Sequence, residues 1–186
     1  MVPTPPAQTV FQLHVELRNV VPAVWRRVLV PGSVKLAKLH EYFQAGMGWT
    51  NSHMHYFGIG DDRYGAQFDE YPDGEINERD VTVMRAIGEH QTFVYEYDFG
   101  DSWEHDVTVE HVARLPRGLQ RAVCLDGANA CPPEDCGGPH GYRDLVEALA
   151  DPTHPEHRDL LDWIGGPFTP TQFDVLAVNV ALQGVR

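Results

Sequence analysis

Apolar and polar residues alternate along several short stretches of this chain, and each of these stretches predicts a β-strand. The first, VFQLHVELR, has apolar side chains at every second position, and a second stretch follows it after the turn at Val20–Val21–Pro22. Two later stretches flank Gly100–Asp101–Ser102 and predict a β-hairpin. The predicted strands are residues 10–18, 23–31, 53–60, 81–85, 92–99 and 103–112.

Helical spacing of apolar residues appears in residues 34–49, where Ser33 is expected to cap the start and Gly48 to end the helix. Further helices are predicted at residues 142–150, 154–164 and 170–182, and loops at 61–80 and 124–142. This order predicts an α+β fold. We expect a single domain with a mixed, mostly antiparallel sheet, an N-terminal ββαβ unit and C-terminal helices.

The expected domain covers residues 10–186, after a disordered N-terminal tail of residues 1–9 that is rich in proline. The C-terminal helices either pack back on the sheet or form a small helical subdomain from about residue 141 onward. Both arrangements are compatible with the pattern.

The hairpin carries an unusual concentration of ionisable groups, in the stretch YEYDFGDSWEHD at residues 95–106. Alternation places aromatic side chains and His105 on the core face, and it places most of the acids on the solvent face. The predicted solvent-facing acids are Glu96, Asp98, Glu104 and Asp106. Alternation does not explain Asp101, which lies at the turn, or His105, which points inward. His105 is either a core imidazole with an internal hydrogen-bond partner, or a metal ligand or proton-transfer group.

Charge and cysteine content exclude several classes of protein. The chain of 186 residues has 14 basic and 27 acidic residues, a formal net charge of −13, which disfavours direct binding of nucleic acid. No segment has the length and apolar character of a membrane span, and the N-terminus does not resemble a secretory signal. Three cysteines are an odd number, so we expect a cytoplasmic protein without a stable structural disulfide.

Two stretches contain metal-ligating residue types. CPPEDCGGPHGY places Cys131 and Cys136 in a Cys-x4-Cys loop, which can hold a zinc ion if His140, His105 or Cys124 completes the site. The alternative is a rigid loop that leads into a helix. In SHMHYF, His53 and His55 either share a metal or occupy half-exposed strand positions. The candidate ligands of a divalent metal such as zinc are His53, His105, Cys131 and Cys136.

Seven sequence motifs follow one another along the chain, in the order VWRRVLVP, LAKLHEYFQAGMGW, SHMHYF, YEYDFGDSWEH, CPPEDCGGPHGY, LADPTHPEH and FDVLAVN. From about residue 10 to 182 the chain therefore resembles the plasmid pRiA4b ORF-3-like family, some members of which are called passenger or TnpR-type proteins of insertion sequences. The resemblance implies a single α+β domain and a link to plasmids or mobile elements, without an established activity. The chain shows neither a serine-recombinase active site nor a basic helix-turn-helix, so it does not support resolvase chemistry. The residues that this resemblance singles out are Trp25, Arg26, Arg27, His40, Gln44, Trp49, His53, Asp98, Asp101, Trp103, His105, Cys131, Glu134, Asp135, Cys136 and Tyr142.

Three functions follow as hypotheses, and whether the protein is an enzyme stays open. We favour a module that binds an unidentified ligand or protein partner, because no complete catalytic constellation is visible. The alternatives are a metal-dependent hydrolase with His, Asp and Cys ligands, and an indirect role in DNA transactions. We expect Asp98, Asp101 and His105 to face the loop that begins at Cys131. The candidate ligand-binding residues are Arg26, Asp98, Asp101, Trp103, His105, Glu134, Asp135 and Tyr142.

Overall fold

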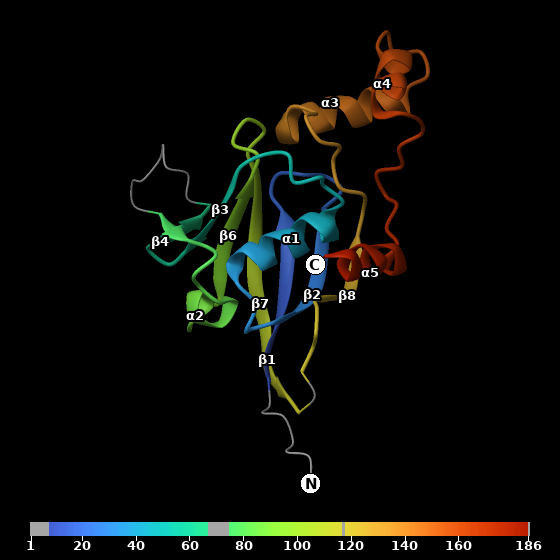
Figure 1. Cartoon of the computed structure of the whole chain (residues 1–186). Coiled ribbons are helices and arrows are strands. Elements are labelled where there is room, and N and C mark those ends of the chain that lie inside the picture. The colour runs from blue at the N-terminus through green and yellow to red at the C-terminus, as the bar shows by residue number, and fades with distance from the viewer. Residues whose placement is uncertain (1–7, 67–74, 117, 186) are drawn as a thin grey trace.

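The computed structural model describes residues 8–66, 75–116 and 118–185, and its centre is one eight-stranded sheet with the order β5-β4-β3-β6-β7-β1-β2-β8 (Figure 1). Neighbouring strands are antiparallel except for β4 and β5, which are parallel. The strands are β1 (Gln8–Leu17), β2 (Trp25–Pro31), β3 (His55–Ile59), β4 (Asp62–Gly65), β5 (Ile76–Asn77), β6 (Thr92–Tyr97), β7 (Trp103–Leu115) and β8 (Val123–Ala128). The helices of the described residues are α1 (Leu36–Met47), α2 (Val83–Ile87), α3 (Gly138–Ala150), α4 (His157–Ile164) and α5 (Val175–Gly184).

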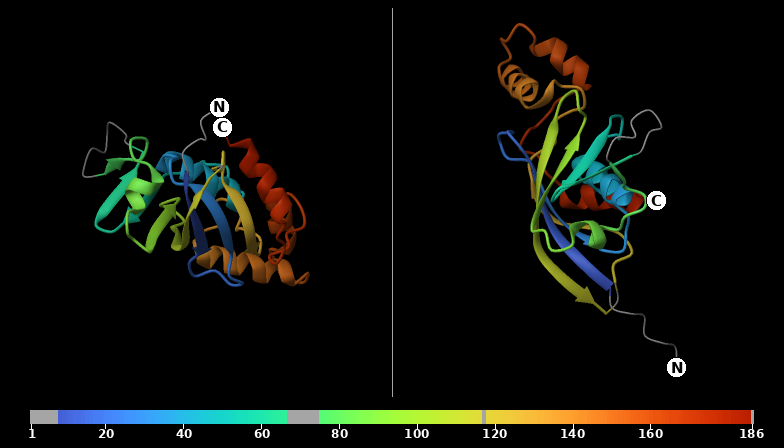
Figure 2. Two further views of the ribbon diagram at one scale, coloured as in Figure 1. Left: turned by 90° about the horizontal axis from the view of Figure 1, so that it is seen from below. Right: turned by 90° about the vertical axis from the view of Figure 1, so that its left-hand side faces the viewer.

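Helices α1 and α5 lie on the same face of the sheet, and the views in Figure 2 show the other face without a covering helix. The alternation of the strands explains this arrangement, since Leu13 and Val15 are buried beneath the helices. On the open face, Arg18 forms ion pairs with Glu104 at 2.7 Å and with Asp106 at 2.6 Å. Two of the four acids predicted on the solvent face of the hairpin, Glu104 and Asp106, are therefore paired with a cation.

Helix α1 supplies one side of the hydrophobic core, with Leu36, Leu39 and Phe43 buried against the sheet. It ends at Gly48, which has a left-handed backbone (φ 97°), as the sequence predicts. The expected cap at Ser33 is wrong. Lys35 occupies the N-cap position without a side-chain hydrogen bond, whereas the Ser33 hydroxyl accepts a hydrogen bond from Gln8.

Three local predictions differ from the structure. The stretch expected to be a strand near 81–85 is the start of α2, where the Thr82 side chain accepts a hydrogen bond from the backbone N–H of Arg85. A strand of this length and a single helical turn bury the same few apolar residues, so alternation cannot separate them. The predicted loop at 124–142 contains most of β8, and the predicted loop at 61–80 contains β4 and β5, although residues 67–74 lie outside the described residues.

The C-terminal helices divide into two groups. Helix α5 contacts α1 and β8 and so belongs to the main core, whereas α3 and α4 contact each other beyond one end of the sheet (Figure 1). The fold is thus a single α+β domain with the predicted ββαβ unit at its N-terminus. Residues 8 and 9 of the expected tail belong to β1, and residues 1–7 lie outside the described residues. No helix in the described part of the chain combines the length and the apolar character needed to cross a membrane.

Candidate metal centre

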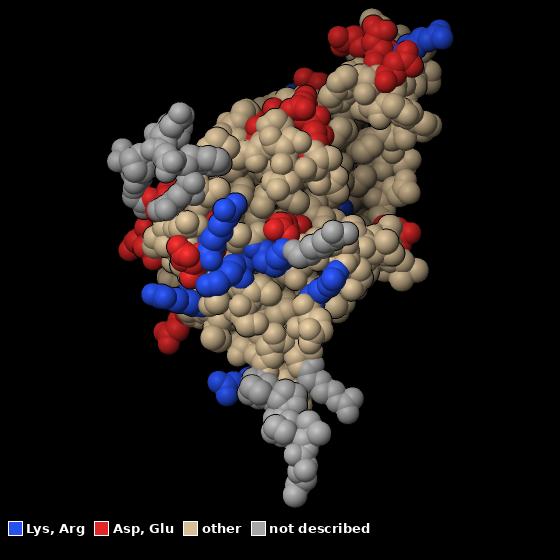
Figure 3. All heavy atoms as spheres, in the orientation of Figure 1, with Lys and Arg blue, Asp and Glu red and all other residues tan. Residues whose placement is uncertain are grey.

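Three segments that are distant in sequence meet at the end of the sheet that faces α3. They are the segment before β3, the turn between β6 and β7, and the loop between β8 and α3. Figure 3 shows acidic side chains gathered on the surface near this end of the molecule. The ionisable residues that approach one another here are His53, Asp98, Glu134 and Asp135.

Asp98 departs from the strand alternation that predicts it on the solvent face. Its backbone is left-handed (φ 57°), so its side chain turns inward and the residue is only 6% exposed. The carboxylate Oδ1 accepts hydrogen bonds from the backbone N–H of Gly100 at 3.0 Å and of Asp101 at 3.4 Å. Aspartate adopts this conformation more readily than most residues because its short side chain bonds to the local backbone.

The turn holds the β8–α3 loop through Asp101. Its Oδ2 accepts a hydrogen bond from the backbone N–H of Gly137 at 3.0 Å. The next residue, Gly138, has φ 69°, and a Cβ atom there would lie 2.4 Å from the carbonyl oxygen of Asp101, so only glycine fits. Trp49 fixes the loop from the other side by donating from Nε1 to the carbonyl of Pro132 at 3.0 Å. Asp101 therefore faces this loop, as predicted from the sequence.

His53 is the centre of the cluster. Its Nε2 lies 3.0 Å from Oδ1 of Asp135, 3.6 Å from Oδ2 of Asp98 and 3.9 Å from Oε2 of Glu134. One ligand atom from each of His53, Asp98 and Asp135 lies within 4.8 Å of the others. The Nε2 atom is buried, yet no hydrogen bond joins it to any described residue. Only the neutral tautomer that carries its proton on Nδ1 leaves a lone pair on Nε2 that can bind a cation.

Hydrogen bonds from Thr50 and Tyr97 fix the Glu134 carboxylate in place. The backbone N–H and the hydroxyl of Thr50 donate to Oε1 at 2.7 Å and 3.0 Å, and the Tyr97 hydroxyl donates to the same oxygen at 3.1 Å. Burial and the neighbouring carboxylate raise the pKa of Tyr97 to about 12, so this phenol remains a donor at neutral pH. The Tyr97 hydroxyl also lies 3.2 Å from Oε2, the oxygen of Glu134 that approaches His53.

The cluster concentrates negative charge. Within the described ranges, the ion pairs of Asp98, Glu134 and Asp135 involve His53 alone, and no lysine or arginine neutralises them. Three carboxylates around one imidazole repel one another unless a cation or bound protons offset the charge. Nitrogen and oxygen donors of this kind suit divalent ions such as Mn²⁺ and Zn²⁺.

A second histidine cluster adjoins the first, and sequence analysis missed it as a unit. The rings of His40 and His55 stack at 3.4 Å, and Nε2 of His55 lies 2.8 Å from Oε2 of the buried Glu78. Burial, together with His55, lowers the pKa of His40 to about 4, so His40 is neutral at pH 7. A pocket of about 240 Å³ is lined by these three residues and by His53. Glu78 carries no sequence signal, because it stands in an acid-rich stretch.

Several predicted site residues lie elsewhere. His105 is fully buried in the core, where Nδ1–H donates to the carbonyl of Tyr95 at 3.1 Å. Trp103 and Tyr142 are also buried, and Tyr142 packs against Phe168. Arg26 lines a separate pocket.

The predicted metal set of His53, His105, Cys131 and Cys136 is not brought together, because in the described residues only His53, Asp98 and Asp135 meet the geometric requirement for a shared ion. His53 and His55 do not share a metal along a strand either, since His53 precedes β3 and the two Nε2 atoms face different carboxylates.

The cysteine thiols are expected to react slowly in the folded protein. All three are free. Burial raises the pKa of Cys124 and that of Cys131, and it raises the pKa of Cys136 to about 12. Because the thiolate is the reactive form, we expect alkylation by iodoacetamide at pH 7.5 to be at least about 100-fold slower than in 8 M urea. Mass spectrometry after timed quenching measures this ratio. Rapid labelling of native Cys136, or a Cys131–Cys136 bridge that blocks labelling in urea, contradicts the expectation.

The comparisons agree with this fold. A family model described as "Plasmid pRiA4b ORF-3-like protein" matches residues 9–177. The uncharacterized protein y4hQ of Sinorhizobium fredii (strain NBRC 101917 / NGR234) is 42% identical over 173 residues, which cover 92% of this chain and 87% of that protein. The crystal structure of MM3350 from Methanosarcina mazei Go1, a protein of unknown function, has a TM-score of 0.83 and 31% identity. The match covers 91% of this chain and 97% of that one.

Proposed function

The chain belongs to the plasmid pRiA4b ORF-3-like family, and on that premise we propose that it is a binding module for a divalent cation held by His53, Asp98 and Asp135. The observation that carries the proposal is the meeting of one ligand atom each from His53, Asp98 and Asp135 within 4.8 Å of one another. Three carboxylates around one imidazole concentrate negative charge, and a cation bound among them offsets that charge.

The distances support a shared ion. Two ligands at about 2.1 Å from one metal, at angles between octahedral and tetrahedral, lie roughly 3.0–3.4 Å apart. Nε2 of His53 lies 3.0 Å from Asp135 and 3.6 Å from Asp98, so small side-chain rotations complete the coordination. Glu134 stands at 3.9 Å and is available as a fourth ligand.

Cation binding is expected to raise the melting temperature. A ligand that binds only the folded state at 100 times its Kd contributes about 2.7 kcal/mol. For a chain of this size that corresponds to a rise of roughly 5–10 °C. Mn²⁺ is the preferred probe, because the thiols compete for Zn²⁺ but bind Mn²⁺ poorly. Differential scanning calorimetry of chelator-treated protein with and without MnCl₂ measures the shift, and elemental analysis of untagged protein reports any ion retained.

Substitution of one ligand separates this site from adventitious binding. Asp98→Asn keeps both the size of the side chain and its tolerance of a left-handed backbone, so the fold is preserved. We expect the affinity for Mn²⁺ to fall at least about 100-fold in isothermal titration calorimetry, since even outer-shell changes cost 10–100-fold. Asp61→Asn, at an exposed turn, is the matched control and should bind as the unaltered protein does. Equal affinity in Asp98→Asn and Asp61→Asn refutes the proposal.

Metal-dependent hydrolysis is a second candidate, favoured by the polar pocket of about 240 Å³ that His53 shares with His40, His55 and Glu78. The Asp135 side chain is 69% exposed, which leaves one side of a bound cation open to water. Glu134 is placed to accept a proton from such a water. If Mn²⁺-loaded protein hydrolyses p-nitrophenyl esters or phosphates and Glu134→Gln removes this turnover while retaining the cation, the second candidate replaces the first.

We also propose that the protein resides in the cytoplasm. Its three free thiols fit a reducing compartment, where cysteines are not converted to disulfides.

A further inference from the structure

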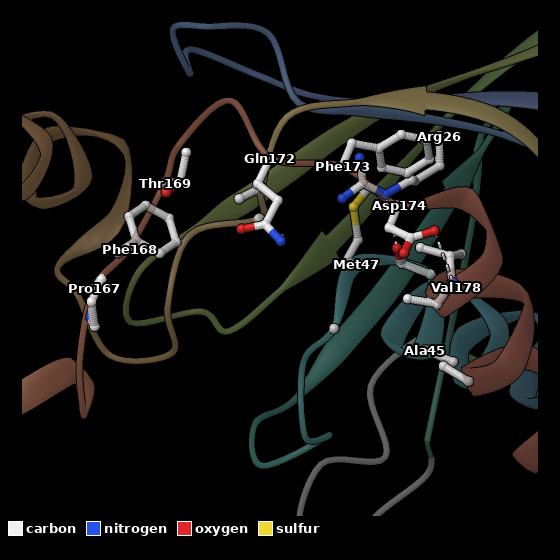
Figure 4. A pocket seen from close by; sticks show the side chains of 16 residues that line it. Arg26, Ala45, Met47, Pro167, Phe168, Thr169, Gln172, Phe173, Asp174 and Val178 are labelled. Atoms are coloured by element: carbon white, nitrogen blue, oxygen red, sulfur yellow. Dashed lines mark hydrogen bonds between the residues drawn. The ribbon is translucent and has the colours of Figure 1, made fainter.

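A second, separate pocket of about 390 Å³ lies between the C-terminal end of α1, the start of the β8–α3 loop and α5. Figure 4 shows Arg26 and Phe173 at one end of this pocket and Pro167 and Phe168 at the other. Most of the lining is apolar, including Ala45 on α1. It shares no residue with the candidate metal centre.

Arg26 is the unusual member of this lining, since it is a cationic residue with only 4% of its surface exposed. Its Nε–H donates to the carbonyl of Gly46 at 2.9 Å, and Nη1 donates to the carbonyls of Trp25 at 2.8 Å and Ala128 at 2.9 Å. The guanidinium carbon lies 4.6 Å from the centre of the Phe173 ring. Every one of these partners is uncharged.

Two consequences follow for the charge of Arg26. Burial lowers its pKa, but an arginine remains protonated at neutral pH, so the positive charge persists inside the pocket. Within the described residues no carboxylate lies within 4.0 Å of it, and no hydrogen bond engages Nη2. A buried charge without a counter-charge is a costly arrangement, and Nη2, which is not among the buried atoms without a partner, is accessible to a ligand in the pocket.

Asp174 is the only acid among the pocket's described residues, and it is occupied elsewhere. Its Oδ1 accepts hydrogen bonds from the backbone N–H of Leu176 at 2.8 Å and of Ala177 at 3.2 Å, which caps the N-terminus of α5. Asp174 thus brings the formal charge of the pocket lining to zero without contacting the guanidinium. A doubly charged anion is disfavoured here, whereas a single carboxylate matches the one cation.

We propose that this pocket binds a hydrophobic monocarboxylate. The carboxylate accepts hydrogen bonds from Nη2 of Arg26, as the planar guanidinium favours. The apolar part of the ligand lies along Ala45, Phe173 and Val178. Such a group is found both in free aliphatic acids and at the C-terminus of a peptide that ends in an apolar residue.

The probes are octanoate, octanamide, N-acetyl-leucine and inorganic phosphate, each titrated by isothermal titration calorimetry and by ¹H–¹⁵N NMR. We expect octanoate to bind about 10–100-fold more tightly than octanamide, because a hydrogen bond to a charged group is lost in the amide. Tighter binding of N-acetyl-leucine than of octanoate identifies a peptide C-terminus as the natural group, and the reverse order identifies an aliphatic acid. The Asp98→Asn protein should bind octanoate unchanged, so failure of the metal centre and failure of this pocket are distinguishable.

Variants test the site without relying on the buried arginine alone. Ala177 is exposed and lines the pocket on α5, so Ala177→Trp should fill the pocket and reduce octanoate affinity at least about 10-fold. Val180→Trp, on the same helix at a position 74% exposed and outside the pocket, is the matched control.

Asp174→Asn retains the helix cap and removes the opposing charge, so it should tighten octanoate binding. Arg26→Met should abolish the preference for octanoate over octanamide.

Three results overturn the proposal. Equal affinity for octanoate and octanamide indicates an apolar pocket that ignores charge. Binding of phosphate as tight as that of octanoate indicates a simple anion site. Unchanged octanoate affinity in Ala177→Trp shows that the acid binds elsewhere.

Discussion

Acidification from pH 7 to pH 4 is expected to remove roughly 3 kcal/mol of folding stability through His105 alone. This histidine is fully buried between Tyr95 and Trp49, and burial lowers its pKa to about 4. In the unfolded chain the pKa of histidine is about 6.5, and each unit of difference corresponds to about 1.4 kcal/mol. Arg18 and Asp106 act on His105 in opposite directions and contribute less than burial does.

The sign follows from proton uptake. Between pH 6.5 and pH 4 the unfolded chain binds a proton at His105 and the folded protein does not, so stability decreases as the pH falls through this range and levels off below about 4. His40 acts in the same direction, since its pKa is also lowered to about 4. Urea unfolding at intervals of half a pH unit, in chelator-treated protein, measures the slope.

His105→Phe isolates the contribution of one histidine. The variant leaves the carbonyl of Tyr95 without its donor and so is less stable at pH 7, but its loss between pH 7 and pH 4 should be smaller by roughly 3 kcal/mol. His111→Ala, at an exposed position on the same strand β7, should run parallel to the unaltered protein. Parallel curves for His105→Phe as well would show that His105 has the same pKa in the folded and unfolded states, contrary to the expectation.

Replacement of Trp103 by alanine is expected to cost about 3–5 kcal/mol. Trp103 is fully buried, its ring lies 6.0 Å from that of Trp49, and its backbone pairs with Tyr97 where the hairpin closes. Truncation leaves a cavity that the rigid sheet cannot refill. Trp163→Ala is the matched control, because Trp163 is 50% exposed on α4 and its removal should change stability by less than about 0.5 kcal/mol. Urea unfolding monitored by far-UV circular dichroism compares the two.

Trp103 is also a predicted ligand contact, and Trp103→Phe tests that role. A phenylalanine retains most of the apolar contact and removes an indole N–H that has no hydrogen-bond partner among the described residues. If Trp103 is structural, Mn²⁺ and octanoate affinities stay within a factor of two while stability decreases. A tenfold loss of either affinity at unchanged stability would instead assign Trp103 to a binding site.

The elements that the sequence predicts well are those with a sustained period. The hairpin and α1 each repeat their apolar spacing over many residues, so their type and position are confirmed. Strand β8, VCLDGA, has no such period because it lies at the sheet edge and buries only Cys124 completely. Helix α2 has five residues, too few for a helical period to differ from alternation.

The residue types predicted that the β6–β7 turn and the β8–α3 loop would meet. They did not predict which side chains would form the cluster there. Asp98 does not follow strand alternation, because its positive φ angle turns the side chain toward the interior. His105 obeys the same rule and is therefore carried into the core, away from the cluster it adjoins in sequence. Glu78 and His40 come together only through the packing of α1 on the sheet, which no local pattern encodes.

The left-handed backbone at Asp98 and Asp135 restricts which residues related chains can carry at these two positions. Asparagine and glycine adopt this conformation as readily as aspartate, so a relative that requires only the two bends accepts all three residues. A relative that requires the charge accepts aspartate alone, because glutamate keeps the charge but loses the conformational preference. Asparagine or glycine at either position thus identifies a descendant that has kept the fold and given up the cation.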